Sequence, residues 1–245
     1  MIIRLGNKSY ILIVFRMELR IQFFVSDVHV LDCETWEWSR MNCSGNYPEM
    51  RFGHTCVIFE TTAIIFGGSR GAGYFNDLHC LDVQSWGWWQ PKTSGVPPTP
   101  RSSHRYWLSF SKITVSHLGL IIRVDFSAVR LNKKIFIFGG IGSTAHTQNE
   151  CLKDIVVLDL DSWSWSAPQV KGAEPQPRFV HRMVEIRSKL LLFGGRTSGR
   201  EKFNDVHLFD PENLTWTKGE SIAGEPPSSR GGCSLVAVGD SVSLL

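Results

Sequence analysis

Histidines recur at one place in a repeated tetrapeptide, and they are the first candidates for chemistry in this sequence. The chain reads "RFGH" at 51–54, "RSSH" at 101–104 and "RFVH" at 178–181. Imidazole nitrogens are common metal ligands, so His54, His104 and His181 would form a metal ring if the fold brought them to one axis. A second series, His29, His79 and His207, is equally regular. Because each histidine occupies an equivalent place in a repeat, we favour a structural role for both series.

Composition argues against several other kinds of chemistry. The six cysteines form no C-x-x-C pair, which favours a reduced protein without a zinc or redox motif. We find no nucleophile–base arrangement and no phosphate loop, so we expect no enzyme activity, no cofactor and no metal. The net charge is only +3 and the basic residues are scattered, so nucleic acid is not an expected partner.

Membrane insertion is not expected either. Residues 1–25 are apolar but interrupted by charged side chains, which makes them a poor spanning segment and a poor signal peptide. We therefore expect a cytoplasmic protein, with the nucleus as the alternative compartment.

The elements that position these residues are set by an internal repeat. Four segments align: "SDVHVLDCETWEW" (26–38), "NDLHCLDVQSWGW" (76–88), "KDIVVLDLDSWSW" (153–165) and "NDVHLFDPENLTW" (204–216). Three of them follow "IIFGG", "FIFGG" or "LLFGG", and each FGG follows an R-x-x-H. The equivalent aspartates stand at 27, 77, 154 and 205, so two of the three steps are close to 50 residues.

Each unit reads as four short strands. An apolar strand follows R-x-x-H, a second ends in FGG, a third alternates, and a fourth carries tryptophan. Paired glycines permit positive φ after the second strand, and the aspartate before each tryptophan suits a turn. The tryptophans supply apolar surface for the space between sheets. Such sheets bury both faces when they pack side by side around an axis, so we predict an all-β propeller of four-stranded antiparallel blades.

The pattern of FGG, N-D-V/L-x-x-L/F-D and W resembles the kelch repeat over roughly residues 26–245. Among kelch proteins it is most similar to the kelch-domain-containing proteins without a BTB domain. The resemblance implies a protein–protein interaction module. Some members of that group are substrate receptors of cullin-type ubiquitin ligases that recognise C-terminal degrons, and others are scaffolds in trafficking or the cytoskeleton. Both roles remain open at this point.

In kelch proteins, the residues just after the motif Arg and just after the GG pair commonly line the binding face. Carried onto this chain, the resemblance gives these candidate partner-binding residues: Phe52, Ser69, Arg70, Ser102, Ser103, Phe179, Arg196 and Arg200. The arginines could bind a carboxylate, either an acidic motif or a peptide C-terminus. The expected partner is therefore a protein or peptide.

One stretch departs from the repeat. The interval from the motif His to the first Gly of the pair is 13 residues in two units (54 to 67 and 181 to 194) but 35 in the third (104 to 139). The excess is one block at about 105–127, which we interpret as translated non-coding sequence; an ordered lid is the alternative. Residues 1–25 also stand outside the repeat, and we treat 26–245 as the propeller fragment.

We expect three full blades plus two half blades, an incomplete ring. An alternative of another class is a galactose-oxidase-like or metal-dependent propeller enzyme. The copper oxidase site needs Tyr and His ligands and a Tyr–Cys crosslink, and this chain has only four tyrosines, two of them in the segments that depart from the repeat.

Overall fold

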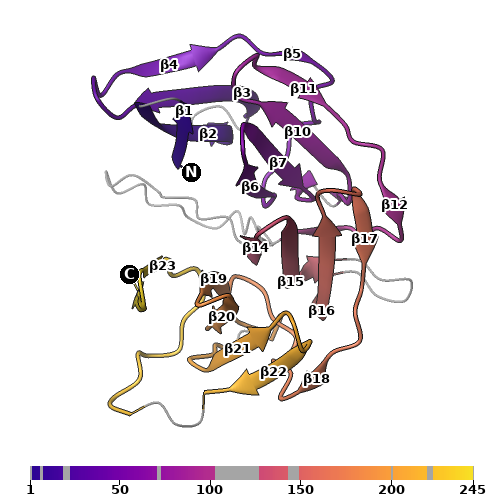
Figure 1. The fold of residues 1–245 in the computed structure, drawn as a ribbon, viewed down its shortest axis with the longest axis vertical. Coiled ribbons are helices and arrows are strands. Elements are labelled where there is room, and N and C mark those ends of the chain that lie inside the picture. The colour runs from indigo at the N-terminus through magenta and orange to yellow at the C-terminus, as the bar shows by residue number, and fades with distance from the viewer. Residues whose placement is uncertain are drawn as a thin grey trace, which may run out of the picture.

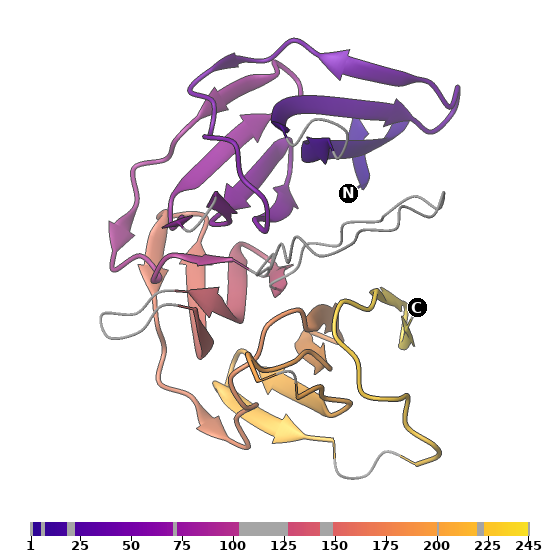
Figure 2. The same cartoon turned by 180° about the vertical axis from the view of Figure 1, so that it is seen from behind.

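A computed structural model describes residues 2–5, 8–18, 23–70, 73–102, 127–142, 149–199, 201–219 and 223–244, with the backbone alone before residue 27. Within these ranges the regular structure is β-strand. Four sheets, each built on four antiparallel strands, follow one another along an arc, from the N-terminal sheet to a C-terminal hairpin (Figures 1 and 2). The all-β propeller prediction is confirmed, and we call the four sheets blades 1 to 4.

The strands of each blade follow one another in chain order. Blade 1 contains β1 (Ile2–Leu5), β2 (Lys8–Glu18), β3 (Phe23–Asp32) and β4 (Trp38–Met41). Blade 2 contains β6 (Thr55–Phe59), β7 (Thr62–Phe66), β10 (Leu78–Asp82) and β11 (Gly87–Trp89). Blade 3 contains β14 (Ser127–Leu131), β15 (Lys134–Gly142), β16 (Glu150–Asp159) and β17 (Ser164–Ser166). Blade 4 contains β19 (Arg182–Ile186), β20 (Lys189–Phe193), β21 (Val206–Asp210) and β22 (Thr215–Lys218).

Shorter strands complete the arrangement. A hairpin of β8 (Ser69–Arg70) and β9 (Gly73–Tyr74) follows the glycine pair of blade 2. The strand β13 (Arg101–Ser102) pairs with the end of β15. A last hairpin, β23 (Leu235–Val238) and β24 (Ser241–Leu244), follows blade 4.

The N-terminal segment differs from the expectation in one respect. We expected a half blade at the N-terminal end, but β2 pairs antiparallel with β3 from Tyr10↔Asp32 to Glu18↔Phe23. Blade 1 therefore has four strands, and the half blade is confined to the C-terminal hairpin. The block at about 105–127 lies outside the described residues apart from Ser127, where β14 begins.

Side chains from adjacent blades form the core. Val28 and Val30 of blade 1 pack with Ile65, Leu81 and Trp88 of blade 2, and equivalent clusters lie between blades 2 and 3 and between blades 3 and 4. The fourth-strand tryptophans fill these spaces as predicted: they are 3%, 5% and 2% exposed at Trp88, Trp165 and Trp216. Trp38, the equivalent residue of blade 1, is 54% exposed.

The predicted turn chemistry is also confirmed. The Oδ1 of Asp82 accepts the backbone N–H groups of Gln84 and Ser85 at 3.0 and 2.7 Å. Asp32, Asp159 and Asp210 cap the equivalent turns. After β7, Gly67 and Gly68 have φ of 65° and 99°, a conformation that side chains with a Cβ rarely adopt.

The linkers between blades add a feature that the repeat did not predict. Each linker contributes a short strand to the outer edge of the next blade: β5 (Ser44–Gly45), β12 (Ser94–Gly95) and β18 (Lys171–Gly172). These strands run parallel to β11, β17 and β22. Within the described ranges, β4 has no such strand on its outer edge.

Candidate functional site

The predicted binding residues lie at one end of the blades, where the second strands finish, and we call this end the loop face. Phe52 forms an antiparallel bridge with Ser69, and Phe179 forms the equivalent bridge with Arg196. Ser102 pairs with Ile141 at the end of β15. The structure therefore brings together the segment after the motif Arg and the segment after the glycine pair. Ser103 and Arg200 lie outside the described residues.

Burial separates the candidates into two groups. Ser69, Ser102 and Phe179 are buried, and the Oγ of Ser69 donates to the Oγ of Ser102 at 3.3 Å, which joins blades 2 and 3. Arg70 is half-exposed, with Nη1 3.6 Å from Oε2 of the exposed Glu49. Arg196 is partly exposed, and its guanidinium carbon lies 4.7 Å from the ring centroid of Phe179. Among the described candidates, the two arginines are the members whose charge is exposed to solvent.

Contacts between loops fix the shape of this face. Ile141, Phe179 and Val180 form a small buried cluster, with Tyr74 and Cys151 against it. The Tyr74 hydroxyl of blade 2 donates to the Asn149 side chain of blade 3 at 2.6 Å. The Ser198 N–H of blade 4 donates to the Cys151 Sγ of blade 3 at 3.2 Å. The sequence did not place Tyr74, Asn149, Cys151 or Ser198 on this face, because the loops that carry them vary from unit to unit.

The motif arginines form buried ion pairs, which sequence reasoning also missed. Arg178 is fully buried, and its Nη1 and Nη2 donate to the two carboxylate oxygens of Asp205 at 2.6 and 2.8 Å. Nη1 also donates to the Gly194 carbonyl at 3.0 Å. Arg51 with Asp77 and Arg101 with Asp154 repeat this arrangement in blades 2 and 3. The sequence did contain a signal for these pairs, because every unit with an R-x-x-H arginine also has the repeat aspartate near the third strand.

The aspartates of these pairs are held ionised. Burial alone would raise the pKa of Asp205, but hydrogen bonds from Arg178 and His207 more than offset it and hold the pKa well below its usual range. Hydrogen bonds from Arg51 and His79 lower the pKa of Asp77 in the same way. His79 and His207 each donate Nε2–H to the Asp Oδ2 at 2.9 Å, so this series of histidines supports the ion pairs.

Of the motif histidines, His181 is fully buried and His54 is partly buried, and both are neutral. Burial, with Arg178 and Arg182 nearby, lowers the pKa of His181 to about 3, and burial beside Arg51 lowers that of His54 to about 4. His181 packs edge-on against Phe138 at 5.4 Å between centroids. His104 lies outside the described residues. Among the residues that the structure describes, no three His, Cys, Asp or Glu side chains are grouped to hold a metal ion.

In the described part of the chain, no helix is long and apolar enough to cross a membrane.

Comparison with known proteins agrees with the blade architecture. The family model of the KLHDC2/KLHL20/DRC7 kelch-repeats domain matches residues 12–120 and 108–244, which together include nearly the whole chain. The chain belongs to the kelch-repeat family. A kelch domain of this kind is a protein–protein interaction module, so protein partners are expected for the chain.

Several relatives are similar to half or more of the chain or to nearly half of it. The Rab9 effector protein with kelch motifs of Rattus norvegicus is 30% identical over 215 residues, which cover 82% of this chain and 50% of that protein. The Gallus gallus protein of the same name is 30% identical over 209 residues. The acyl-CoA-binding domain-containing protein 4 of Arabidopsis thaliana is 35% identical over 127 residues, 48% of this chain and 18% of that protein. The kelch chain thus spans about half the length of the Rab9 effector relatives.

Proposed function

We propose that the loop face of this kelch domain binds an acidic segment of a partner protein, and that the chain acts as a scaffold in membrane trafficking. The observation that carries the proposal is the pair of accessible arginines, Arg70 and Arg196, which follow the glycine pairs of two different blades. The Rab9 effector relatives favour trafficking over the other scaffold roles of the family. This role would place the chain in the cytoplasm.

The surroundings of the two arginines suit them to this task. Arg196 stacks on the buried ring of Phe179, so little side-chain entropy is lost when its guanidinium donates to a carboxylate. Arg70 faces Glu49 at 3.6 Å with both side chains exposed, an ion pair that water screens and that a stronger carboxylate ligand can replace. The loops are anchored by interblade contacts such as Tyr74 with Asn149, which keeps the face preorganised.

A binding titration tests the trafficking role. We expect the chain to bind Rab9 loaded with a GTP analogue more tightly than Rab9 loaded with GDP. Arg70→Gln and Arg196→Gln should each weaken binding about tenfold, because a hydrogen bond to a charged group is worth about 1.5–3 kcal/mol. Arg130→Gln is the matched control: Arg130 is also exposed, but it lies near the start of β15, at the opposite end of the blade.

Two results of this titration would contradict the proposal. Binding that is independent of nucleotide would refute an effector-like role. Equal binding by the Arg196→Gln and Arg130→Gln variants would refute the loop face as the contact surface.

A second candidate is a substrate receptor for a cullin-type ubiquitin ligase. Guanidinium groups can bind a terminal carboxylate with two parallel hydrogen bonds, so the same arginines favour recognition of a peptide C-terminus. A peptide with a free C-terminal carboxylate should then bind, and its C-terminal amide should not. Equal affinity for the two peptides would refute this candidate and leave the scaffold role.

A further inference from the structure

The turns at the end of the blades opposite the loop face carry tryptophans in a shared conformation. Trp86 of blade 2 and Trp163 of blade 3 each end an aspartate-capped turn, with φ of 57° and 50°. Each is partly buried against the apolar cluster that joins its blade to the preceding one. The cleft between blades 1 and 2 and the cleft between blades 2 and 3 therefore have the same tryptophan wall on one side.

The opposite wall differs between these two clefts. Trp89 of blade 2 and Ser39 of blade 1 occupy equivalent register positions in their fourth strands. The ring of Trp89 packs edge-on against Trp163, with 5.4 Å between the ring centroids. In the cleft between blades 1 and 2, Ser39 supplies no such ring. One cleft is thus filled by an aromatic side chain of the preceding blade, and the other is not.

A hollow of about 590 Å³ lies in the unfilled cleft, with Ser39 in its lining. Its volume is within the range of sites that bind ligands. Apolar side chains of both blades also line it: Val30, Met41, Val83 and Trp86. The packing of Trp89 on Trp163 in the neighbouring cleft shows which kind of group fits beside such a turn tryptophan, namely a second aromatic ring.

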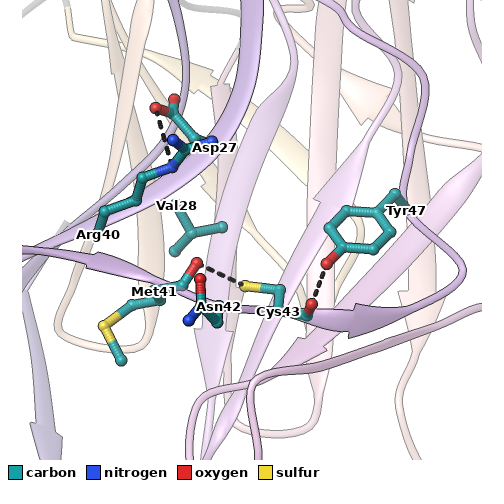
Figure 3. Close-up of a pocket in the computed structure, with 7 residues that line it drawn as sticks. All are labelled: Asp27, Val28, Arg40, Met41, Asn42, Cys43 and Tyr47. Atoms are coloured by element: carbon teal, nitrogen blue, oxygen red, sulfur yellow. Dashed lines mark hydrogen bonds and ion pairs between the residues drawn. The ribbon is translucent and has the colours of Figure 1, made fainter.

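The charge of this hollow is acidic. Among the described residues that line it, the charged ones are Asp32 and Glu37. Asp32 accepts backbone N–H groups of its own turn, so the exposed Glu37 is the carboxylate that we assign to a partner. The second hollow between these blades, of about 240 Å³, differs in charge, because there Oδ2 of Asp27 lies 3.8 Å from Nε of Arg40 (Figure 3). The first hollow therefore suits a cation better than the second.

We propose that the hollow between Ser39 and Trp86 is a docking site for a partner-protein segment that carries an aromatic side chain close to a Lys or Arg. The aromatic ring packs on Trp86 as Trp89 packs on Trp163, and the basic group faces Glu37. Buried aromatic anchors supply much of the binding energy of protein interfaces, and charge complementarity selects the partner. This surface lies at the opposite end of the blades from the loop face, so it is independent of the proposed binding of an acidic segment there.

Fluorescence anisotropy on the full chain tests the proposal with a labelled peptide, WQPKT, blocked at both ends. This is the chain's own segment 89–93, and it carries both of the required side chains. We expect saturable binding. Ala in place of the peptide tryptophan should abolish it, because the ring supplies most of the apolar area that is buried. Gln in place of the peptide lysine should weaken binding about two- to fivefold, which is the contribution of an exposed ion pair.

Substitutions in the protein complete the test. Ser39→Trp should fill the hollow, abolish peptide binding and raise the melting temperature, and Glu37→Gln should weaken binding as much as the Gln peptide does. Ser166→Trp is the matched control, because Ser166 occupies the equivalent register position in blade 3, and it should leave binding unchanged.

Several results would overturn the proposal. They are absence of binding by the parent chain, equal binding by the Ala peptide or by the Ser39→Trp chain, and a lowered melting temperature of that chain, which would show that the hollow does not accept an indole ring. Equal binding by the Gln peptide and by the Glu37→Gln chain would overturn the assignment of a basic partner.

Discussion

The informative residue of the R-x-x-H motif is its arginine. Arg51, Arg101 and Arg178 are at most 3% exposed, and each joins the start of a blade to an aspartate that lies just before or within the third strand. A guanidinium in such a place needs a partner for its charge and for several N–H groups, and the aspartate and the glycine carbonyl supply both. The histidine of the motif packs beside this pair as a neutral ring.

Breaking one of these pairs should strongly destabilise the domain. Asp205→Asn keeps the side-chain shape but leaves Arg178 buried without a counter-charge, which should cost about 3–5 kcal/mol in the free energy of unfolding. Urea unfolding measures this cost. Asp240→Asn is the control, because Asp240 pairs with Arg187 at the surface and its loss should have no measurable effect. Equal stability of the two variants would contradict a structural role for the buried pair.

The buried histidines predict a pH dependence of stability. His181 has a folded-state pKa of about 3, against about 6.5 in the unfolded chain, so between these values only the unfolded chain binds the proton. Stability should therefore fall as the pH drops below 6.5, by about 1.4 kcal/mol per pH unit for each such histidine. The depressed pKa values of Asp77 and Asp205 act in the same direction, but only below about pH 4.

Melting temperatures from pH 7.5 to pH 4.5 check this dependence. His181→Gln should flatten the curve relative to the parent chain. A parent melting temperature that stays constant down to pH 5 would contradict the neutral, buried state of His181.

At the scale of elements, the short linker strands fasten each blade to the one before it. Each pairing involves only two residues, yet the linker places the motif arginine of the next blade. The glycine is required because its backbone has positive φ and because the tryptophan carbonyl leaves no room for a Cβ.

A glycine substitution tests the fastening. Gly95→Ala should destabilise the chain, because its φ is +77° and its Cβ would lie 2.2 Å from the Trp165 carbonyl oxygen. Gly224→Ala has a similar φ of +94° but no atoms within 4 Å, so it should cost only the conformational strain of about 1–2 kcal/mol. Thermal unfolding compares the two variants. A Gly95→Ala chain that is no less stable than the Gly224→Ala chain would mean that the linker strand is not docked.

Local sequence was sufficient to predict most of the elements but not how they connect. The strands, the Asp turns and the glycine pairs follow from short patterns, and the structure confirms them. The linker strands escaped prediction because a two-residue parallel pairing has no periodicity. The ion pairs were not predicted because their partners lie 26, 53 and 27 residues apart in the sequence.

The location of the candidate residues in the fold was predicted in part; their role in binding stays a prediction. The sequence placed Ser69, Ser102 and Phe179 with the arginines, and the structure places all of them at the same end of the blades. It buries the first three, because neighbouring loops pack on one another, and a single-unit pattern carries no information on that packing.

At the scale of the whole molecule, stability depends on the contacts between consecutive blades. Among the described residues, three apolar clusters lie between the four blades, so blades 2 and 3 take part in a cluster on both faces and blade 1 in one. Equivalent residues in different blades therefore differ in burial, and the fourth-strand tryptophans show the difference most clearly.

The same substitution, Trp to Ala, can be compared at the equivalent positions of blade 4 and blade 1. Trp216→Ala removes a side chain that packs on Phe138 and Phe209 and should cost about 3–5 kcal/mol. Trp38→Ala removes an exposed side chain at the equivalent position, so it should cost much less and should reduce self-association. Chemical unfolding and light scattering check the two expectations. Similar losses of stability would show that blade 1 is covered in solution.

The central claim is that the blades form a rigid scaffold whose loop face binds an acidic partner, and hydrogen exchange tests it most directly. Amide exchange would be measured by mass spectrometry on the full chain, with and without a saturating Glu- and Asp-rich peptide. The account predicts slower exchange at Ser69–Arg70 and at 196–199, with no change at the turns 132–133 and 187–188 at the opposite end of the blades. Protection at those turns, or none at the loop face while the peptide is bound, would contradict it.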